Sequence, residues 1–480
     1  MRGSRLLLCL ATVGLAGCQS TSVTDPTPSA IKPNPATIEI EVCPLSGKTV
    51  TSGKLPRWFS IYFGVLAHSN GKVYIGTNYH VARLVEFDPR TKTCKVVAAM
   101  SSRALHGGGP KLDTPTLRGD LGDGQFPMNR WVHAQDKIHA QLHEGRDGRV
   151  YGATHVKVEQ ADSTRTYPGG HWFAYDPRTG KTEDLGWARR HEGIITCCMD
   201  RERNVLYGVT WPTGYLIECR PGESDYRKRL HLLGTACTQL DCSPRYFDVV
   251  RDGRVYVPDG ATGEVRVYDP KRRWMHRVPG LLTPPGPDGG LPAHAGALRA
   301  TGRWRNWWMN GTKSPDGMHL FFVGQRSGHL TEIDATQGKW GVVIDHGRTV
   351  PWGKPDWSGP WPRMMCFGPG GLLFYAIGEQ LLTYDPKSGV IADWGRTVSK
   401  SVPGRSIKLG CGGALGKDGR IYCAVGRGVG ILDPRPIEAR WRRMYSFKEG
   451  NAPRFVRRSP RRVIRPISER TTAVTKTGTE

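Results

Sequence analysis

The 480-residue sequence has few long apolar runs, and the one prominent run lies within the first twenty residues. No later stretch is long and apolar enough for a membrane-spanning helix, so none is expected in the mature chain. The sequence also has no C-x-x-C pairs, which argues against a structural zinc site. It shows no G-x-S-x-G elbow, phosphate-binding loop or dinucleotide fingerprint in a fitting context, and no paired-carboxylate signature of glycoside hydrolysis. The common hydrolase and nucleotide-binding classes therefore have no support in the sequence.

The composition favours a turn-rich globular protein over a helical bundle. Hydrophobic residues make up 38% of the chain, which also contains 35 prolines and 61 glycines. The formal net charge is +25, and part of it lies in residues 448–480, which have few large apolar side chains and are expected to form a disordered basic tail. The remaining body is also basic, so an acidic partner is expected at its surface.

The first residues are typical of an export signal. Two arginines precede the apolar run, and the run ends in the letters LAGC at positions 15–18. This ending resembles the lipobox of bacterial lipoproteins. The resemblance implies a signal peptide over 1–17 and a lipid on Cys18 that attaches the protein to a membrane. Ordinary cleavage, with Cys18 incidental, is the alternative.

Residues 18–37 are interpreted as a flexible tether. Gln19 and Ser20 provide no aspartate that would retain a lipoprotein at the inner membrane. We therefore expect a lipid-anchored protein of the outer membrane, periplasmic or at the cell surface, without a nucleic-acid partner. In that oxidising setting Cys237 and Cys242 could close a small loop, and buried free thiols are the alternative.

Two short phrases recur along the chain. A Gly-containing turn followed by a β-rich run occurs seven times, as in DGRVYGATH at 147, DGRVYVPDG at 252 and DGRIYCAVG at 418. A second phrase follows most copies, as in YDPRTGK at 175 and YDPKSG at 384. Asp-Gly supplies the positive φ of a tight hairpin, Val, Ile and Tyr favour strands, and Asp-Pro with Thr-Gly-Lys turns the chain into a further strand.

Each repeat therefore forms a small antiparallel sheet that cannot bury both of its faces alone. A spacing of about fifty residues matches the blades of a β-propeller. The sequence predicts an all-β protein, a monomeric seven-bladed β-propeller of four-stranded antiparallel blades over residues 38–447.

Residues 137–155 contain three histidines. On a strand, His139 and His143 are about 13 Å apart at their Cα atoms, which is too far for one metal ion. His139, near the start of the first strand, and His155, at the end of the second, should meet at one face of the ring, whereas His143 lies deeper and is expected to be structural. The loop after His155 returns toward the same face. The predicted catalytic residues are His139, His155, Tyr167 and His171.

Other repeats place polar and aromatic residues at the equivalent strand ends. The alternative at each position is a polar group that is hydrogen-bonded within its own blade. The predicted substrate-binding residues are Arg245, Tyr246, Arg326, Arg363, Trp211 and Glu192.

Histidine, tyrosine and arginine in a basic propeller suit an acidic oligo- or polysaccharide that contains uronic acid. Arginine binds a carboxylate through two parallel hydrogen bonds, and neutralising the carboxylate acidifies the proton on the adjacent carbon. A neutral histidine or a tyrosinate removes that proton, and a tyrosine or second histidine protonates the leaving oxygen. The predicted reaction is β-elimination without a cofactor. A non-catalytic propeller that binds glycan or protein at the outer membrane is the alternative.

Three phrases, KIHAQLHEGRDGRVYGATH at 137, YPGGHWFAYDPRTGKTEDLG at 167 and HEGIITCCMDRERNVLYGVTWPTG at 191, resemble the blades of seven-bladed propeller polysaccharide lyases. Within that group, the phrases resemble those of the rhamnose–glucuronate lyases. The resemblance implies a histidine base, either His139 or His155. It also implies arginines that hold the uronate carboxylate, for which Arg245 and Arg363 are the candidates.

Another group of propeller lyases acts on oligogalacturonate and uses a metal ion bound by several histidines. In this chain His80, His155 and His171 could supply such ligands, although no matching motif is present. A divalent metal therefore stays an open alternative to cofactor-free catalysis.

Overall fold

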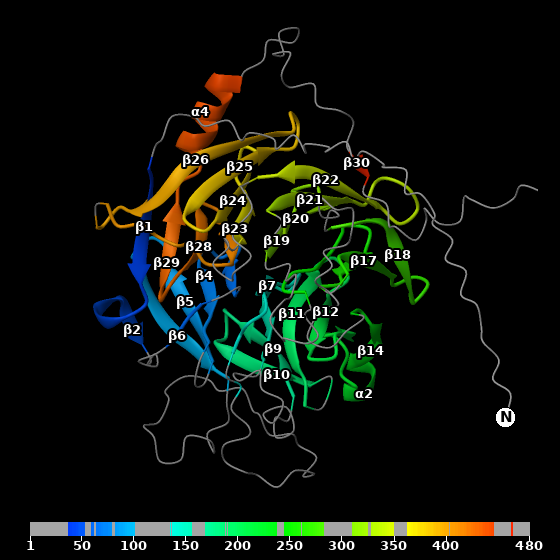
Figure 1. Ribbon diagram of the computed structural model, residues 1–480. Helices are drawn as coiled ribbons and strands as arrows, with labels where there is room; N and C mark the ends of the chain where they lie inside the picture. The colour runs from blue at the N-terminus through cyan, green and yellow to red at the C-terminus, as the bar shows by residue number, and fades with distance from the viewer. Residues whose placement is uncertain are drawn as a thin grey trace, which may run out of the picture.

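The computed structural model describes residues 37–52, 59–61, 64–78, 82–100, 135, 137–155, 169–187, 189, 191–237, 244–260, 262–282, 310–324, 328–349, 362–402, 404–445 and 462–463. These residues form short strands in antiparallel sheets that are arranged around a central axis (Figure 1). The predicted all-β propeller architecture is confirmed. The predicted signal peptide, Cys18 and nearly all of the tether lie outside the described residues.

The strands group in chain order into four-stranded units, which we call blades 1 to 7. The described residues contain seven such units, and the blade number of the whole chain stays a prediction. Blades 1 to 4 are β3 Val65–Ala67, β4 Val73–Gly76, β5 Arg83–Asp88 and β6 Thr93–Ala99; β7 His143–Glu144, β8 Val150–Ala153, β9 His171–Asp176 and β10 Lys181–Trp187; β11 Gly193–Asp200, β12 Val205–Trp211, β13 Tyr215–Cys219 and β14 Leu230–Thr235; β15 Asp248–Val249, β16 Val255–Pro258, β17 Glu264–Asp269 and β18 Trp274–Leu281.

Blades 5 to 7 follow the same order, except that the last strand of blade 7 comes from the start of the chain. They are β19 Asn310–Lys313, β20 His319–Val323, β21 His329–Asp334 and β22 Val342–Arg348; β23 Pro362–Phe367, β24 Leu373–Ile377, β25 Gln380–Asp385 and β26 Val390–Ser399; β27 Gly413–Leu415, β28 Ile421–Val425, β29 Gly428–Leu432 and β1 Ile38–Pro44. The smaller elements are η1 Gly47–Thr49, β2 Val50–Ser52, α2 Tyr226–Arg229, α4 Arg435–Tyr445 and β30 Arg462–Val463.

The recurring phrases form the turns that the sequence predicts. Gly148 lies between β7 and β8 with φ of 74°, a region that glycine adopts without strain. The Asp147 carboxylate accepts the Arg149 amide proton across that turn at 3.1 Å. In the hairpin between β9 and β10, Asp176 accepts the Arg178 amide proton at 2.9 Å. Asp-Gly therefore joins the first and second strands of a blade, and Asp-Pro joins the third and fourth.

The N-terminal strand β1 closes the ring. Residues 41–44 of β1 pair antiparallel with β29, and residues 38–40 pair parallel with β26. One strand thus completes blade 7 and joins it to blade 6. Strand β27 of blade 7 in turn packs against β3 of blade 1. Segments at the two ends of the chain therefore depend on each other for their hydrogen bonds.

The hydrophobic core lies between neighbouring blades. Ile138 and Leu142 of blade 2, for example, pack in one buried cluster with Tyr74 and Leu84 of blade 1. Such inter-blade packing fixes the position of each first strand near the axis.

The C-terminal residues cover the outside of the ring. Glu438 of α4 accepts the amide proton of Gly370 at 2.8 Å, and Trp441 is buried against blade 6. Within the predicted basic tail, β30 pairs with β22, so these two residues are ordered against blade 5, and the rest of the tail lies outside the described residues. No helix in the described part of the chain is long and apolar enough to cross a membrane.

The pairing of β1 predicts a large stability effect at Ile40. This side chain is fully buried, whereas its neighbour Glu39 is exposed. Ile40→Ala should lower the free energy of unfolding by about 2–4 kcal/mol because it leaves a cavity at the closure. Glu39→Ala should change it by less than about 0.5 kcal/mol. Denaturant titrations of both variants measure the difference, and equal effects would contradict the closure.

The cysteines give a second prediction. Apart from Cys237, the eight cysteines in the described residues are free and buried, and burial raises the pKa of Cys94 to about 11 and that of Cys366 to about 12. Because only the thiolate is nucleophilic, these thiols should not react with a thiol reagent at pH 8 until the protein unfolds. Labelling followed by intact-mass measurement tests this, and rapid modification of these eight thiols in the folded protein would refute it.

Candidate functional site

The structure brings His139 and His155 together, as their places on the strands predict. The centroids of the two rings are 5.8 Å apart, and the rings meet edge to face. Lys137 forms a β-bridge with His155 directly after β8, which places the segment that leads into β7 beside the end of the second strand. Both histidines are buried, and His155 has no exposed surface.

Trp211 and Gly193 of blade 3 hold the His155 ring from the other side. The indole ring of Trp211 lies 5.6 Å from the imidazole and nearly perpendicular to it. A Cβ atom on residue 193 would lie 2.0 Å from Nδ1 of His155, so only glycine admits the ring here. The site therefore spans blades 2 and 3.

The tautomer of His139 follows from its hydrogen bond. Nδ1 lies 3.1 Å from the backbone oxygen of Ile195 on β11. A carbonyl oxygen only accepts, so Nδ1 carries the hydrogen. In the neutral ring the lone pair is then on Nε2, which is the arrangement that a general base needs.

The next polar residues along the chain also contact β11, although the strand expected to begin near His139 is formed in the structure only at β7, His143–Glu144. Gln141 accepts a hydrogen bond from the hydroxyl of Thr196 at 2.9 Å and donates one to the Arg245 carbonyl at 3.1 Å. His143 Nε2 donates to the Cys197 carbonyl at 3.0 Å. Since β7 and β11 belong to different sheets, these side chains satisfy carbonyl and hydroxyl groups that no backbone ladder reaches. His143 has the structural contact expected for it.

Two cationic residues near this site were missed by the sequence analysis. Lys137 is only 8% exposed and bridges Asn78 of blade 1 and His155 through the backbone. Arg83, which begins β5, is equally buried, and burial lowers the pKa of its guanidinium. The signal for Lys137 was present, because it alternates with His139 and Gln141 on one strand.

His171 has a different environment from the one predicted. Its Nδ1 lies 3.0 Å from both carboxylate oxygens of Asp184, at the bulge of the neighbouring β10. His329 with Asp345 at 3.0 Å and Gln380 with Asp393 at 3.3 Å repeat this contact in blades 5 and 6. A contact shared by three blades is part of the blade architecture, and the predicted catalytic role of His171 stays a prediction.

Tyr246 also has an internal partner. Its hydroxyl donates to the Asp248 carboxylate at 2.8 Å, and its ring packs edge to face against Phe322 of blade 5. Burial, and then the Asp248 charge, raise the pKa of this hydroxyl far above its ordinary value. Tyr246 thus packs in the core between blades 4 and 5, and its predicted contact with substrate stays a prediction.

Both carboxylate oxygens of Glu192 accept a hydrogen bond. Arg189 and the hydroxyl of Thr213 each donate to it at 2.5 Å. Its backbone carbonyl also accepts the Gly170 amide proton at 2.8 Å. These contacts hold the entry to β11 beside blade 2, so Glu192 orients the loop around the histidine pair.

The two arginines predicted to bind a carboxylate lie at the starts of first strands. Arg245 precedes β15 and is almost completely buried, with its carbonyl linked to Gln141. Arg363 is half-buried on β23, and its Nη1 lies 3.9 Å from Sγ of Cys411. The predicted residues that lie outside the described part of the chain are Tyr167, Arg326 and His80.

Comparison with known proteins shows the fold. Neither a protein-family model nor a curated protein matches the sequence. A streptogramin B lyase structure matches with a TM-score of 0.51 and 11% identity over 82% of this chain and 97% of that chain. Virginiamycin B lyase from Staphylococcus aureus matches with a TM-score of 0.50 and 10% identity over 82% and 99%. The likeness establishes a β-propeller and leaves the chemistry to be argued from the residues.

The structural role of His143 predicts a pH dependence. Burial lowers its pKa and outweighs the opposing effects of Asp248 and the Cys197 carbonyl. The unfolded chain therefore binds the proton more tightly, and stability falls as the pH drops below about 6.5. His143→Gln keeps a hydrogen-bond donor but does not titrate. The free energy of unfolding of this variant should therefore fall less steeply with decreasing pH than that of wild type, and the two slopes should differ by up to about 1.4 kcal/mol per pH unit. Denaturant titrations at pH 7.5 and 5.5 measure this, and parallel pH profiles would contradict it.

Proposed function

We propose that the protein is a lyase that cleaves a uronate-containing glycan by β-elimination at the His139–His155 pair. The observation that carries the proposal is the contact of two buried imidazoles, 5.8 Å between centroids, with Nδ1 of His139 committed to the Ile195 carbonyl. The first ring thereby presents Nε2 as a base, and the second supplies a proton donor within the same site.

The reaction proceeds in three linked events. Nε2 of His139 takes the proton from the carbon next to the uronate carboxylate. The electron pair of that C–H bond forms the new C=C bond as the bond to the glycosidic oxygen breaks, and His155 in its protonated form donates a proton to the departing oxygen. In this proposal Lys137, Arg245 and Arg363 balance the negative charge that develops on the carboxylate.

The charge and the N-terminus fit an extracytoplasmic polyanion as substrate. The net charge of +25 favours acidic partners and speeds their association. The lipid on Cys18 would hold the protein at the outer membrane, where such glycans occur outside the cytoplasm. Trp211 beside His155 offers an apolar wall that excludes water from the reacting centre.

A non-catalytic propeller that binds an acidic glycan is the second candidate. It is favoured by one specific observation, the ladder of His139, Gln141 and His143 with β11, because this ladder accounts for all three side chains by inter-blade bonding. The two candidates differ in whether Nε2 of His139 acts on a substrate.

The decisive experiment is an assay of the purified protein against a panel of uronate glycans, including rhamnose-capped ones, by ultraviolet absorbance of the unsaturated product. His139→Gln keeps a donor for the Ile195 carbonyl but removes the base, so it should lower the rate at least about 100-fold. His143→Gln makes the same chemical change four residues along the strand and should retain activity. Running the assay with and without a chelator tests the metal alternative.

Glycan binding without any unsaturated product would establish the binding protein and refute the lyase. Equal rates for wild type and His139→Gln would refute the assigned base.

A further inference from the structure

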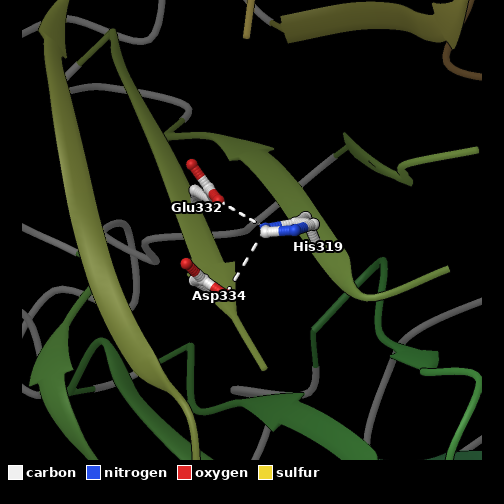
Figure 2. Close-up of side chains that lie close together, drawn as sticks. All are labelled: His319, Glu332 and Asp334. Carbon is white, nitrogen blue, oxygen red and sulfur yellow. Dashed lines mark hydrogen bonds and ion pairs between the residues drawn. The ribbon is translucent and has the colours of Figure 1, made fainter. Parts of the chain in front are cut away.

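A second polar cluster lies in blade 5, away from the histidine pair. Figure 2 shows the ring of His319, at the start of β20, directed toward the carboxylates of Glu332 and Asp334 on β21. Nδ1 of His319 lies 2.7 Å from Oε1 of Glu332 and 3.6 Å from Oδ1 of Asp334. The second strands of the blades end at the face that carries His155, so His319 lies toward the opposite face.

The two carboxylates of this cluster are buried, and each is oriented by hydrogen bonds. Glu332 is 3% and Asp334 is 2% exposed, whereas His319 is half-buried. The other oxygen of Glu332, Oε2, lies 2.6 Å from Nε2 of His346. The hydroxyl of Tyr384 lies 3.0 Å from Nδ1 of the same ring. A hydrogen-bonded imidazole therefore fixes the rotamer of the Glu332 carboxylate and leaves Oε1 facing His319.

The remaining two groups are held in the same manner. Thr336 donates its hydroxyl to Oδ1 of Asp334 at 2.5 Å, and Gln337 donates to Oδ2 at 2.6 Å. Nε2 of His319 faces the Asp316 carboxylate at 3.6 Å, so when a metal ion replaces the hydrogen that Nδ1 donates to Glu332, the remaining hydrogen lies on Nε2 and points to Asp316. A carboxylate behind an imidazole, with the opposite nitrogen turned inward, is the usual outer environment of a metal-binding histidine.

At this position blade 5 differs from blades 1, 2, 4 and 7. Lys72 precedes β4 of blade 1 at the equivalent place and forms an ion pair with Asp88 at 2.5 Å. The residues before the second strands of blades 2, 4 and 7 are Arg149, Arg254 and Arg420. A permanent cation is thus replaced in blade 5 by an imidazole, beside two carboxylates whose charge needs a positive partner.

We propose that His319 Nδ1, Glu332 Oε1 and Asp334 Oδ1 bind one divalent transition-metal ion of the zinc class, with a water molecule as the fourth ligand. Donor atoms of a tetrahedral zinc site lie about 3.3 Å apart, because each bond is about 2.0 Å long. The separations of 2.7 and 3.6 Å bracket this distance, and all three donors lie within 4.8 Å of one another. One nitrogen and two oxygen donors suit Zn²⁺ better than Ca²⁺, which takes six to eight oxygens.

The site would join the start of β20 to the end of β21 and take the place of the lysine–aspartate pair of blade 1. The ion is therefore expected to stabilise blade 5 from the face opposite to the proposed reacting centre.

The test uses the full-length protein without a polyhistidine tag, stripped with EDTA and titrated with Zn²⁺ by calorimetry at neutral pH. Wild type should bind one ion with Kd of about 10 μM or lower and gain about 3 °C or more in its unfolding midpoint at saturating Zn²⁺. His319→Lys installs the cation of blade 1, so it should keep the midpoint of the stripped wild type and weaken binding at least about 100-fold.

His231→Lys is the matched control, since it removes an imidazole from β14 far from this cluster and should bind Zn²⁺ like wild type. His319→Gln provides a second variant should the lysine impair folding, with the same expected loss. Absence of Zn²⁺ binding by wild type up to about 1 mM, or wild-type affinity in both His319 variants, would overturn the proposal.

Discussion

The first strands of neighbouring blades must satisfy polar backbone groups without sharing a ladder. Between blades 2 and 3 this requirement is met by side chains, because His139 and His143 donate to the carbonyls of Ile195 and Cys197 on β11. A buried carbonyl without a partner costs free energy comparable to a lost hydrogen bond. Polar residues near the axis are therefore required by the architecture, and the proposed reacting centre is built from one of them.

This constraint explains how one residue serves both structure and chemistry. The bond that His139 makes to blade 3 also fixes its tautomer, since a carbonyl accepts only from a protonated Nδ1. The position of His155 then depends on Gly193, which leaves room for the ring, and on Trp211, which packs against it. The histidine pair is thus positioned by contacts with β11 and β12 of blade 3.

The sequence predicts those features that are set by local rules. Asp-Gly and Asp-Pro turns repeat with strand-favouring residues, which predicts the blades, and the direction of two adjacent strands places His139 next to His155. Features set by partners far along the chain were not predictable. The partner of His171 is an aspartate at a bulge thirteen residues away, and the strand that completes blade 7 is the first one of the chain. The cluster at His319 was missed because its ligands meet across a hairpin and match no metal-binding spacing.

The central claim is that the inter-blade bond holds His139 as a neutral imidazole with its lone pair on Nε2. Long-range proton–nitrogen correlation spectra of the ¹⁵N-labelled protein at neutral pH measure this directly, with the signals absent from a variant lacking His139 providing the assignment. The account predicts a hydrogen on Nδ1 and none on Nε2. A hydrogen on Nε2, or on both nitrogens, would contradict it.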